Sequence, residues 1–160
     1  MISLYIVLFI EVGFNFISKG GESRKVPDSD SMAFAVHRQH FSNNQHKEFL
    51  VAYENGVKIF TFQVITGDDE TTTNPGIYPV KLKDPDYYSK KFDTPMPYSI
   101  FFDLKERKAI HGGEVPPPIQ RVNWATHGCV HVEMPYIKQL YDWVEVGKTV
   151  VVVEGWRDED

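Results

Sequence analysis

Apolar and polar residues alternate through the middle of the chain in the pattern typical of β-strands. Residues 49–53 and 57–62 are two such runs, and Glu54-Asn55-Gly56 separates them. Both central residues of a type I′ turn need positive φ, which Asn and Gly adopt most readily. The sequence therefore predicts a β-hairpin here, whose second strand continues to Ile65 and ends at Thr66-Gly67.

Shorter apolar runs predict further strands at 32–37, 98–102, 108–111 and 149–153. We expect a polar loop carrying His37, His40 and His46 as solvated side chains, since their spacing matches no common metal-ligand pattern. Residues 81–97 are rich in Lys, Pro and Tyr, and this composition predicts a long surface loop.

One segment has the apolar spacing of an α-helix. Ile137, Leu140, Tyr141 and Val144 fall at i, i+3, i+4 and i+7, so they share one face. Pro135 suits the first helical turn, and Gly147 suits the C-terminal cap. The predicted class is therefore mainly β, a β-rich α+β fold with a single late helix.

Residues 1–17 are apolar, but Glu11 and Asn15 interrupt them and no Lys or Arg precedes Lys19. The apolar stretch is shorter than the roughly 20 residues of a spanning helix. It fits an atypical export signal, a weak membrane anchor or a first buried strand, and we favour export. Residues 20–31 are polar, with Gly and Pro. We divide the chain into this apolar segment and linker (1–31), a folded domain (32–155) and a polar tail (156–160).

The net charge and the cysteine content exclude some classes of function. The 160 residues carry 17 Lys and Arg against 22 Asp and Glu, a formal charge of −5, with no basic stripe. This argues against nucleic acid as a partner, because phosphate binding needs clustered cations. A single cysteine excludes an internal disulfide framework. Its thiol is then a buried apolar group, a metal ligand or a nucleophile.

Reactive residue types gather between positions 111 and 131, as His111-Gly112-Gly113 and Thr126-His127-Gly128-Cys129-Val130-His131. A cysteine attacks carbonyls as its thiolate, and histidine is its natural base near neutral pH. A neighbouring glycine lets backbone N–H groups turn toward an oxyanion. Zinc is the alternative, because His127, Cys129 and His131 would share one side of a strand, with His111 as a fourth ligand. The glycines favour tight turns over a regular strand.

This segment resembles the signature of the L,D-transpeptidase (YkuD-type) family, which is a His-Gly pair, a loop, then Ser/Thr-His-Gly-Cys-Val/Ile-Arg. Other blocks are similar and occur in the family's order, so the resemblance covers about 32–154. They are Val64-Ile65-Thr66-Gly67, Thr73-Asn74-Pro75-Gly76-Ile77-Tyr78, Met96-Pro97-Tyr98, and Leu140 with Val144 and Gly147-Lys148-Thr149-Val150. The resemblance implies a β-sandwich or curled mixed sheet with one helix after the cysteine.

The resemblance also implies residue roles. Cys129 would be the nucleophile and His111 its general base, oriented by the carbonyl of Gly112 or Gly113. His127 would support the site by hydrogen bonding, and amides at His127, Gly128 and Cys129 could form an oxyanion hole. Residues expected along the substrate groove are Thr126, His131, Trp124 and Tyr98. His131 stands where the family usually has Arg, which replaces a permanent charge by a side chain mostly neutral at pH 7.

The implied activity is acyl transfer on the stem peptides of bacterial peptidoglycan, through a thioester on Cys129 and with no metal or organic cofactor. Such an enzyme is carbapenem-sensitive and acts after export, in the periplasm or cell wall, and residues 1–17 could associate with the membrane. An L,D-carboxypeptidase, a wall hydrolase or a secreted wall-targeting effector would use the same site. A non-catalytic wall- or zinc-binding module is disfavoured, because both His111 and Cys129 are present.

Overall fold

One mixed sheet dominates the computed structural model, which describes residues 15–17, 23–25, 32–41, 46–67, 72–116 and 125–159. Its strand order is β6-β11-β3-β4-β5-β10-β9-β8-β7. Neighbouring strands are antiparallel except for the parallel pairs β11–β3 and β10–β9. The strands are β3 (Met32–Phe41), β4 (His46–Glu54), β5 (Val57–Ile65), β6 (Gly76–Pro79), β7 (Leu82–Ser89), β8 (Thr94–Asp103), β9 (Lys108–Gly112), β10 (Val130–Val132) and β11 (Val150–Glu159).

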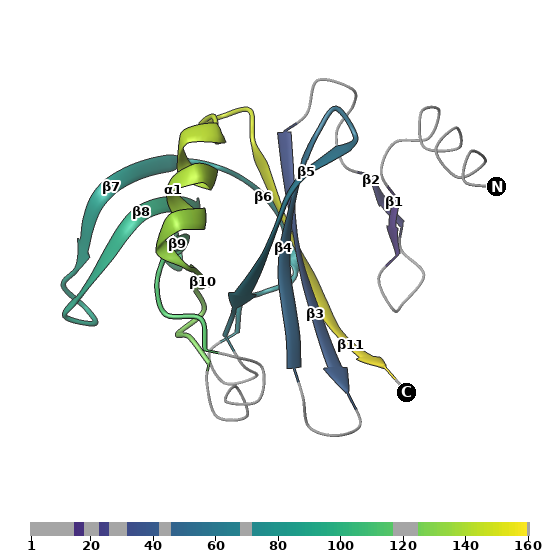
Figure 1. Ribbon diagram of the computed structural model, residues 1–160, viewed down its shortest axis with the longest axis horizontal. Helices are drawn as coiled ribbons and strands as arrows, with labels where there is room; N and C mark the ends of the chain where they lie inside the picture. The colour runs from purple at the N-terminus through teal and green to yellow at the C-terminus, as the bar shows by residue number, and fades with distance from the viewer. Residues whose placement is uncertain are drawn as a thin grey trace.

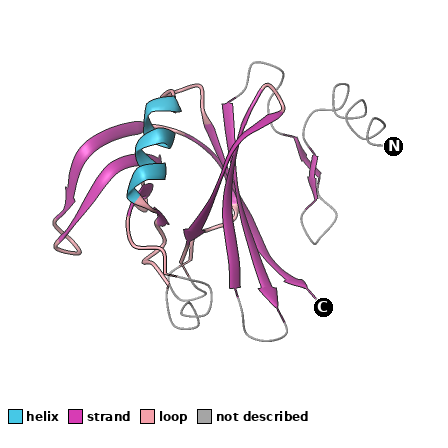
Figure 2. Cartoon of the chain, viewed as in Figure 1, coloured by secondary structure: helices cyan, strands magenta, loops and turns pink. Residues whose placement is uncertain are grey.

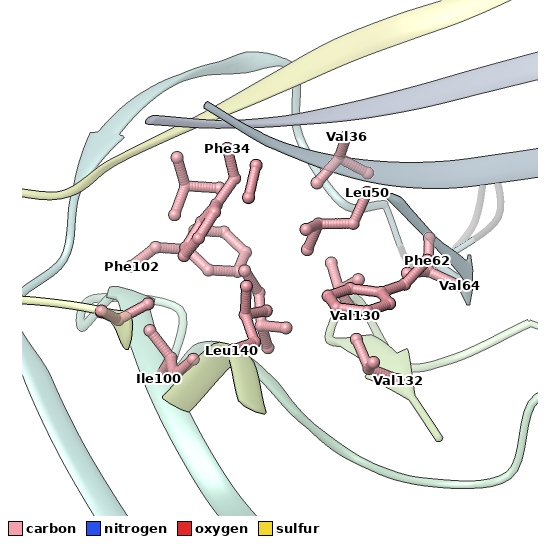
Figure 3. Close-up of a cluster of buried hydrophobic side chains, with 14 of the residues drawn as sticks. Phe34, Val36, Leu50, Phe62, Val64, Ile100, Phe102, Val130, Val132 and Leu140 are labelled. Carbon is pink, nitrogen blue, oxygen red and sulfur yellow. The ribbon is translucent and has the colours of Figure 1, made fainter. Parts of the chain in front are cut away.

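The sheet curls, so that its two halves face each other with helix α1 (Met134–Trp143) beside them (Figure 1). Figure 2 shows how strands outweigh helix in the described residues. Phe34, Leu50 and Phe62 come from one half and Ile100 and Phe102 from the other, and their side chains meet in one core (Figure 3). Val130 and Val132 of β10 and Ile137 and Leu140 of α1 complete this core. The mainly β class is thus confirmed, and the described part of the chain holds a single helix, after Cys129.

The hairpin expected from the Asn-Gly pair is confirmed as β4 and β5. Asn55 has φ 50° and Gly56 has φ 79°, the positive values that a type I′ turn requires. The strands expected at 98–102, 108–111 and 149–153 are confirmed as parts of β8, β9 and β11.

The surface loop expected at 81–97 is wrong, because these residues form the β7–β8 hairpin. Prolines misled the sequence interpretation, since proline cannot donate to a central strand ladder. Pro85 lies on β7, which is the edge of the sheet. Pro95 and Pro97 lie in the part of β8 that pairs only with β7, since β9 pairs from Ile100 onward. The prolines therefore occupy positions where a missing N–H costs little.

Other boundaries also differ from expectation. His37 and His40 lie within β3 and His46 begins β4, and the His37 Nδ1 lies 2.7 Å from a Glu154 carboxylate oxygen. The strands extend further than their apolar runs because backbone pairing continues past the last buried residue. Helix α1 ends at Trp143 with Val144 as its C-cap, whereas Gly147 lies in a later turn with φ 81°.

The two chain ends also contain strands. Part of the segment assigned as a linker forms β2 (Ser23–Lys25), which pairs with β1 (Asn15–Ile17). Most of the expected polar tail belongs to β11, whose pairing with β3 continues to Glu159. Among the described residues, no helix is both long enough and apolar enough to span a membrane.

Candidate active site

Parallel pairing of β9 and β10 brings two histidines together. His131 is in register with His111, and Val130 and Val132 are in register with Ile110 and Gly112. Successive side chains of a strand point to opposite faces, so the two valines enter the core while the histidines share the other face. The imidazole centroids of His111 and His131 lie 4.6 Å apart, with the rings inclined by 63°.

His111 is buried and held by its neighbour's backbone. Its Nδ1 lies 2.9 Å from the carbonyl oxygen of Gly112. A carbonyl only accepts, so Nδ1 carries the proton and Nε2 is the nitrogen that can accept another. Burial lowers the pKa of His111 to about 4, helped by the nearby His131 and opposed by the Gly112 hydrogen bond. The imidazole is therefore neutral at pH 7.

Cys129 lies in the turn that leads into β10. Its partly buried side chain packs against the cluster of Met96, Phe101 and Ala109. Burial raises the pKa of the Cys129 thiol, while the backbone N–H of Ala109 and the positive charge of Lys108 act to lower it. Burial is the largest of these effects, so the thiol form predominates at neutral pH.

Thr126 and Gly128 give this turn its shape. The Thr126 hydroxyl donates to the carbonyl oxygen of Cys129 and accepts from the Gly128 N–H at 3.1 Å. Gly128 has φ 100°, which an L side chain rarely adopts. A Cβ at this position would also lie 2.9 Å from Cε of Lys108 and 3.1 Å from the carbonyl oxygen of Thr72. Glycine is therefore required immediately before the cysteine.

Hydrogen bonds tie the turn to the end of β5. The Thr73 hydroxyl donates to the Gly128 carbonyl at 3.1 Å and accepts from the Gly67 N–H at 2.9 Å. The Thr126 N–H donates to the Thr66 carbonyl at 2.9 Å. The buried Glu48 carboxylate accepts from the Thr66 N–H at 2.8 Å. Buried, satisfied networks of this kind fix one geometry, and here they fix the position of the cysteine.

His127 makes a contact that differs from the one expected. Its side chain is exposed and stacks on Phe92, with ring centroids 4.6 Å apart and an interplanar angle of 26°. Phe92 belongs to the turn between β7 and β8. The supporting hydrogen bond that the resemblance implies for His127 stays a prediction.

Two clefts meet at the cysteine. One, of about 410 Å³, includes in its lining His111, Gly112, Gly113, Thr126, Cys129 and His131. The other, of about 570 Å³, lies between the β7–β8 hairpin and the β8–β9 turn. Both are lined by Phe92, Met96, His127 and Cys129. Cys129 thus borders both clefts.

Not every expected residue lies here. The Tyr98 side chain packs against Tyr141 of α1, with centroids 5.5 Å apart, and lines neither cleft. Its φ of 54° turns the chain locally out of regular strand geometry. Trp124 lies outside the described residues. Gly113 does line the first cleft, where an added Cβ would lie 2.7 Å from Cγ and Nδ1 of His131.

Sequence reasoning missed Lys108 and Phe92. Lys108 is buried, and its Nζ donates to the Thr72 carbonyl at 2.6 Å beneath the cysteine turn. A lysine opening an otherwise apolar strand was a signal that could have found it. Phe92 sits among lysines in a segment assigned as a loop, and no spacing links it to His127.

The zinc alternative gains no support from the described geometry. In the part of the chain that the structure describes, no three His, Cys, Asp or Glu side chains form a group that could hold a metal ion. His127 points toward Phe92, and His111 is engaged with Gly112.

Comparison with known proteins gives consistent matches. The model of the YkuD family, described as the L,D-transpeptidase catalytic domain, matches residues 40–153. No match was found among curated proteins. Among solved structures, an L,D-transpeptidase (Yku) from Stackebrandtia nassauensis has a TM-score of 0.65 at 24% identity, covering 82% of this chain and 59% of that chain.

Two further solved structures share the fold. The catalytic domain of an Enterococcus faecium L,D-transpeptidase has a TM-score of 0.53 at 23% identity, covering 74% of this chain and 95% of that chain. L,D-transpeptidase 3 from Mycobacterium tuberculosis, in complex with a faropenem-derived adduct, has a TM-score of 0.58 at 16% identity. The match covers 76% of this chain and 61% of that chain. At such identities the likeness extends to the fold alone.

Proposed function

Because the chain belongs to the YkuD family of L,D-transpeptidase catalytic domains, we propose that it transfers acyl groups between peptides through a thioester on Cys129. The observation that carries the proposal is that Cys129 and His111 line one cleft, with His111 Nδ1 fixed on the Gly112 carbonyl. This arrangement leaves Nε2 as the proton acceptor that a thiol nucleophile needs.

In the first half-reaction the Cys129 sulfur attacks a peptide carbonyl carbon while its proton passes to His111 Nε2. The C–N bond of the tetrahedral intermediate then breaks, and the imidazolium returns that proton to the leaving amine. The products are a thioester on Cys129 and a released amino acid. His131, whose own pKa is lowered by burial, lies beside His111, and repulsion between two protonated imidazoles favours the neutral, basic form of His111.

The developing oxyanion needs backbone donors in the cysteine turn. The Gly128 N–H already donates to the Thr126 hydroxyl, and the Gly113 N–H donates to the Val132 carbonyl at 3.0 Å. The N–H groups of His127 and Cys129 are therefore the donors that we assign to the oxyanion. Gly112 instead provides the carbonyl that accepts from His111 Nδ1, and Gly113 packs closely against the His131 ring.

In the second half-reaction an acceptor attacks the thioester and frees the thiol. Two clefts that share Cys129 give separate approaches to a donor and an acceptor peptide. We infer that an amine is the acceptor, which makes the reaction a transpeptidation. Attack by water at the same thioester would give L,D-carboxypeptidase activity, the second candidate function.

The substrates that we propose are the stem peptides of peptidoglycan, whose leaving group is a terminal D-alanine. Family membership supports this substrate class. The chain spans 59% of the length of the Stackebrandtia nassauensis protein, so substrates and partners of a whole protein belong to the proposal. Peptidoglycan lies outside the cytoplasmic membrane, and the apolar residues 1–17 fit export to that compartment.

The proposal is tested by intact-mass spectrometry after incubation with faropenem or a carbapenem. The single cysteine makes the result unambiguous, since only one thiol can be acylated. We expect one adduct on the parent protein and none on Cys129→Ala. His111→Asn should be acylated about 10²–10⁴ times more slowly, the usual contribution of a general base.

Product analysis then separates the two candidate functions. The protein is incubated with a tetrapeptide stem, with and without an amine acceptor, and products are weighed by mass spectrometry. A cross-linked peptide together with D-alanine supports transpeptidation, whereas tripeptide and D-alanine alone support carboxypeptidase activity. A folded parent protein that forms no adduct and no product would contradict both.

A further inference from the structure

The larger cleft beside Cys129 is unusually basic. Its lining includes five cationic side chains and one acidic side chain: Lys90, Lys91, Lys105, Arg107, Lys108 and Glu106. The chain as a whole carries a formal charge of −5. This local excess of positive charge is therefore opposite in sign to the rest of the molecule.

Two turns bring these cations together from separate parts of the sequence. Lys90 and Lys91 lie in the turn between β7 and β8, and Lys105 and Arg107 lie in the turn between β8 and β9. The Lys91 Nζ lies 4.9 Å from the centroid of the Phe92 ring, which itself stacks on His127. Arg107 donates to the Tyr87 hydroxyl at 3.4 Å. These contacts place Lys91 and Arg107 beside aromatic side chains that line the cleft.

Lys108 connects the basic cleft to the nucleophile. It is buried, it lines the same cleft as Cys129, and its Nζ is anchored on the Thr72 carbonyl below the cysteine turn. The other cleft differs, because its described lining carries Glu114 and three histidines but no Lys or Arg. Positive charge is thus concentrated on one of the two approaches to the thiol.

We propose that this basic cleft binds the carboxylate-bearing end of a peptide substrate and so presents the neighbouring carbonyl to Cys129. This inference rests on the proposed acyl-transfer function. A free carboxylate is the anion that a peptide of this class carries close to the bond that breaks. Clustered Lys and Arg attract such a group over distance and discriminate against a neutral end.

Paired alkylating agents test the cleft without any peptide chemistry. Iodoacetate and iodoacetamide form the same kind of thioether with Cys129 and release iodide, but only iodoacetate is anionic. We measure both rates by intact mass and divide each by the rate for 2-mercaptoethanol, a neutral free thiol. We expect the iodoacetate-to-iodoacetamide ratio to exceed that of the free thiol and to fall toward it in about 0.5 M salt, where screening acts within a few ångströms.

Neutralising exposed cations should lower that ratio. Lys90→Gln with Lys91→Gln should slow iodoacetate about threefold and leave iodoacetamide unchanged, as expected for two partly screened charges. Lys105→Gln with Arg107→Gln should act in the same direction. The matched control is Lys58→Gln with Lys148→Gln, two exposed lysines that line neither cleft. Equal ratios in parent and cleft variants, or an equal fall in the control, would overturn the proposal.

A peptide pair then tests the assignment of the ligand. Two tetrapeptide donors differ only in a C-terminal carboxylate or amide. We expect the parent to show a lower KM for the carboxylate peptide, and the Lys90→Gln, Lys91→Gln variant to raise that KM toward the value for the amide peptide. If the alkylation ratios change as expected while neither peptide reacts, the proposed acyl transfer fails although the cleft binds anions. If both peptides react with the same KM, the carboxylate assignment itself is wrong.

Discussion

Burial pushes both reactive side chains of the first cleft toward their neutral forms. The pKa of Cys129 is raised and that of His111 is lowered to about 4, and in each case burial is the largest cause. A preformed thiolate–imidazolium pair would need the opposite shifts. The resting site therefore holds a thiol and a neutral imidazole, so the proposed acyl transfer requires the thiol proton to move as the sulfur attacks the carbonyl.

The rate of Cys129 alkylation should follow this protonation state. We expect the iodoacetamide rate to be low at neutral pH and to rise continuously into the alkaline range, because only the small thiolate fraction reacts. An ion pair would instead give a plateau that begins in the acid range, where the thiol loses its proton, and extends through neutral pH. Intact-mass kinetics across the pH range measure the difference, and a plateau through neutral pH would contradict the resting state described above.

Some residues of the candidate site could be predicted from their chemical type, and others could not. Cys129 and His111 stood out because a lone thiol and a histidine, each beside glycine, are a recognisable combination of nucleophile and base. Phe92 and Lys108 did not, because their importance comes from three-dimensional neighbours. Phe92 stacks on His127 only because the β7–β8 turn lies beside the cysteine turn, and no local sequence pattern specifies that position.

Among the elements, those with local signals were predictable. The β4–β5 hairpin follows from Asn55-Gly56, and α1 follows from apolar residues at helical spacing after Pro135. The β7–β8 hairpin was missed because its prolines are compatible with strands only on the edge strand β7 and in the part of β8 that pairs with β7 alone. Which residues of β7 and β8 have a partner strand on both sides depends on the order of strands in the whole sheet, and no local sequence pattern gives that order.

A lysine from β7 caps the end of the helix and offers a test at this scale. The Lys83 Nζ donates to the carbonyl oxygens of Tyr141 and Val144, the latter at 2.8 Å. A cation at this end also interacts favourably with the helix dipole. We expect Lys83→Met to lower the free energy of unfolding by about 1–2 kcal/mol.

Thermal denaturation followed by circular dichroism measures this effect. For a chain of this size, the loss corresponds to a Tm lower by about 3–6 °C. Lys81→Met is the matched control, because Lys81 is an exposed lysine two residues away. A similar shift in both variants would show that capping by Lys83 contributes nothing specific.

For the whole molecule, the buried His111 links the candidate site to stability in acid. The pKa of His111 falls from an ordinary 6.5 to about 4 on folding, so between these values the unfolded chain binds more protons. The free energy of unfolding then decreases as pH falls through this window. Because the shift covers more than two pH units, His111 alone contributes roughly 2–3 kcal/mol to the decrease.

Urea denaturation between pH 7 and pH 4 measures the slope. His111→Gln has no group to titrate, so its stability should fall less steeply than that of the parent. The difference between the two curves isolates this histidine from the other titrating groups. Parallel curves would mean that His111 gains its proton as readily in the folded protein as in the unfolded chain.

Strand β11 fills the gap between β6 and β3, although it follows every other described element in the sequence. Val151 and Val153 also belong to the core. During synthesis, the edge of β3 that pairs with β11 stays unpaired until residues 150–159 leave the ribosome. Contacts between such distant segments slow folding, and unpaired edges invite aggregation. The nascent chain is therefore expected to depend on chaperones until its synthesis reaches β11, and to fold only afterwards.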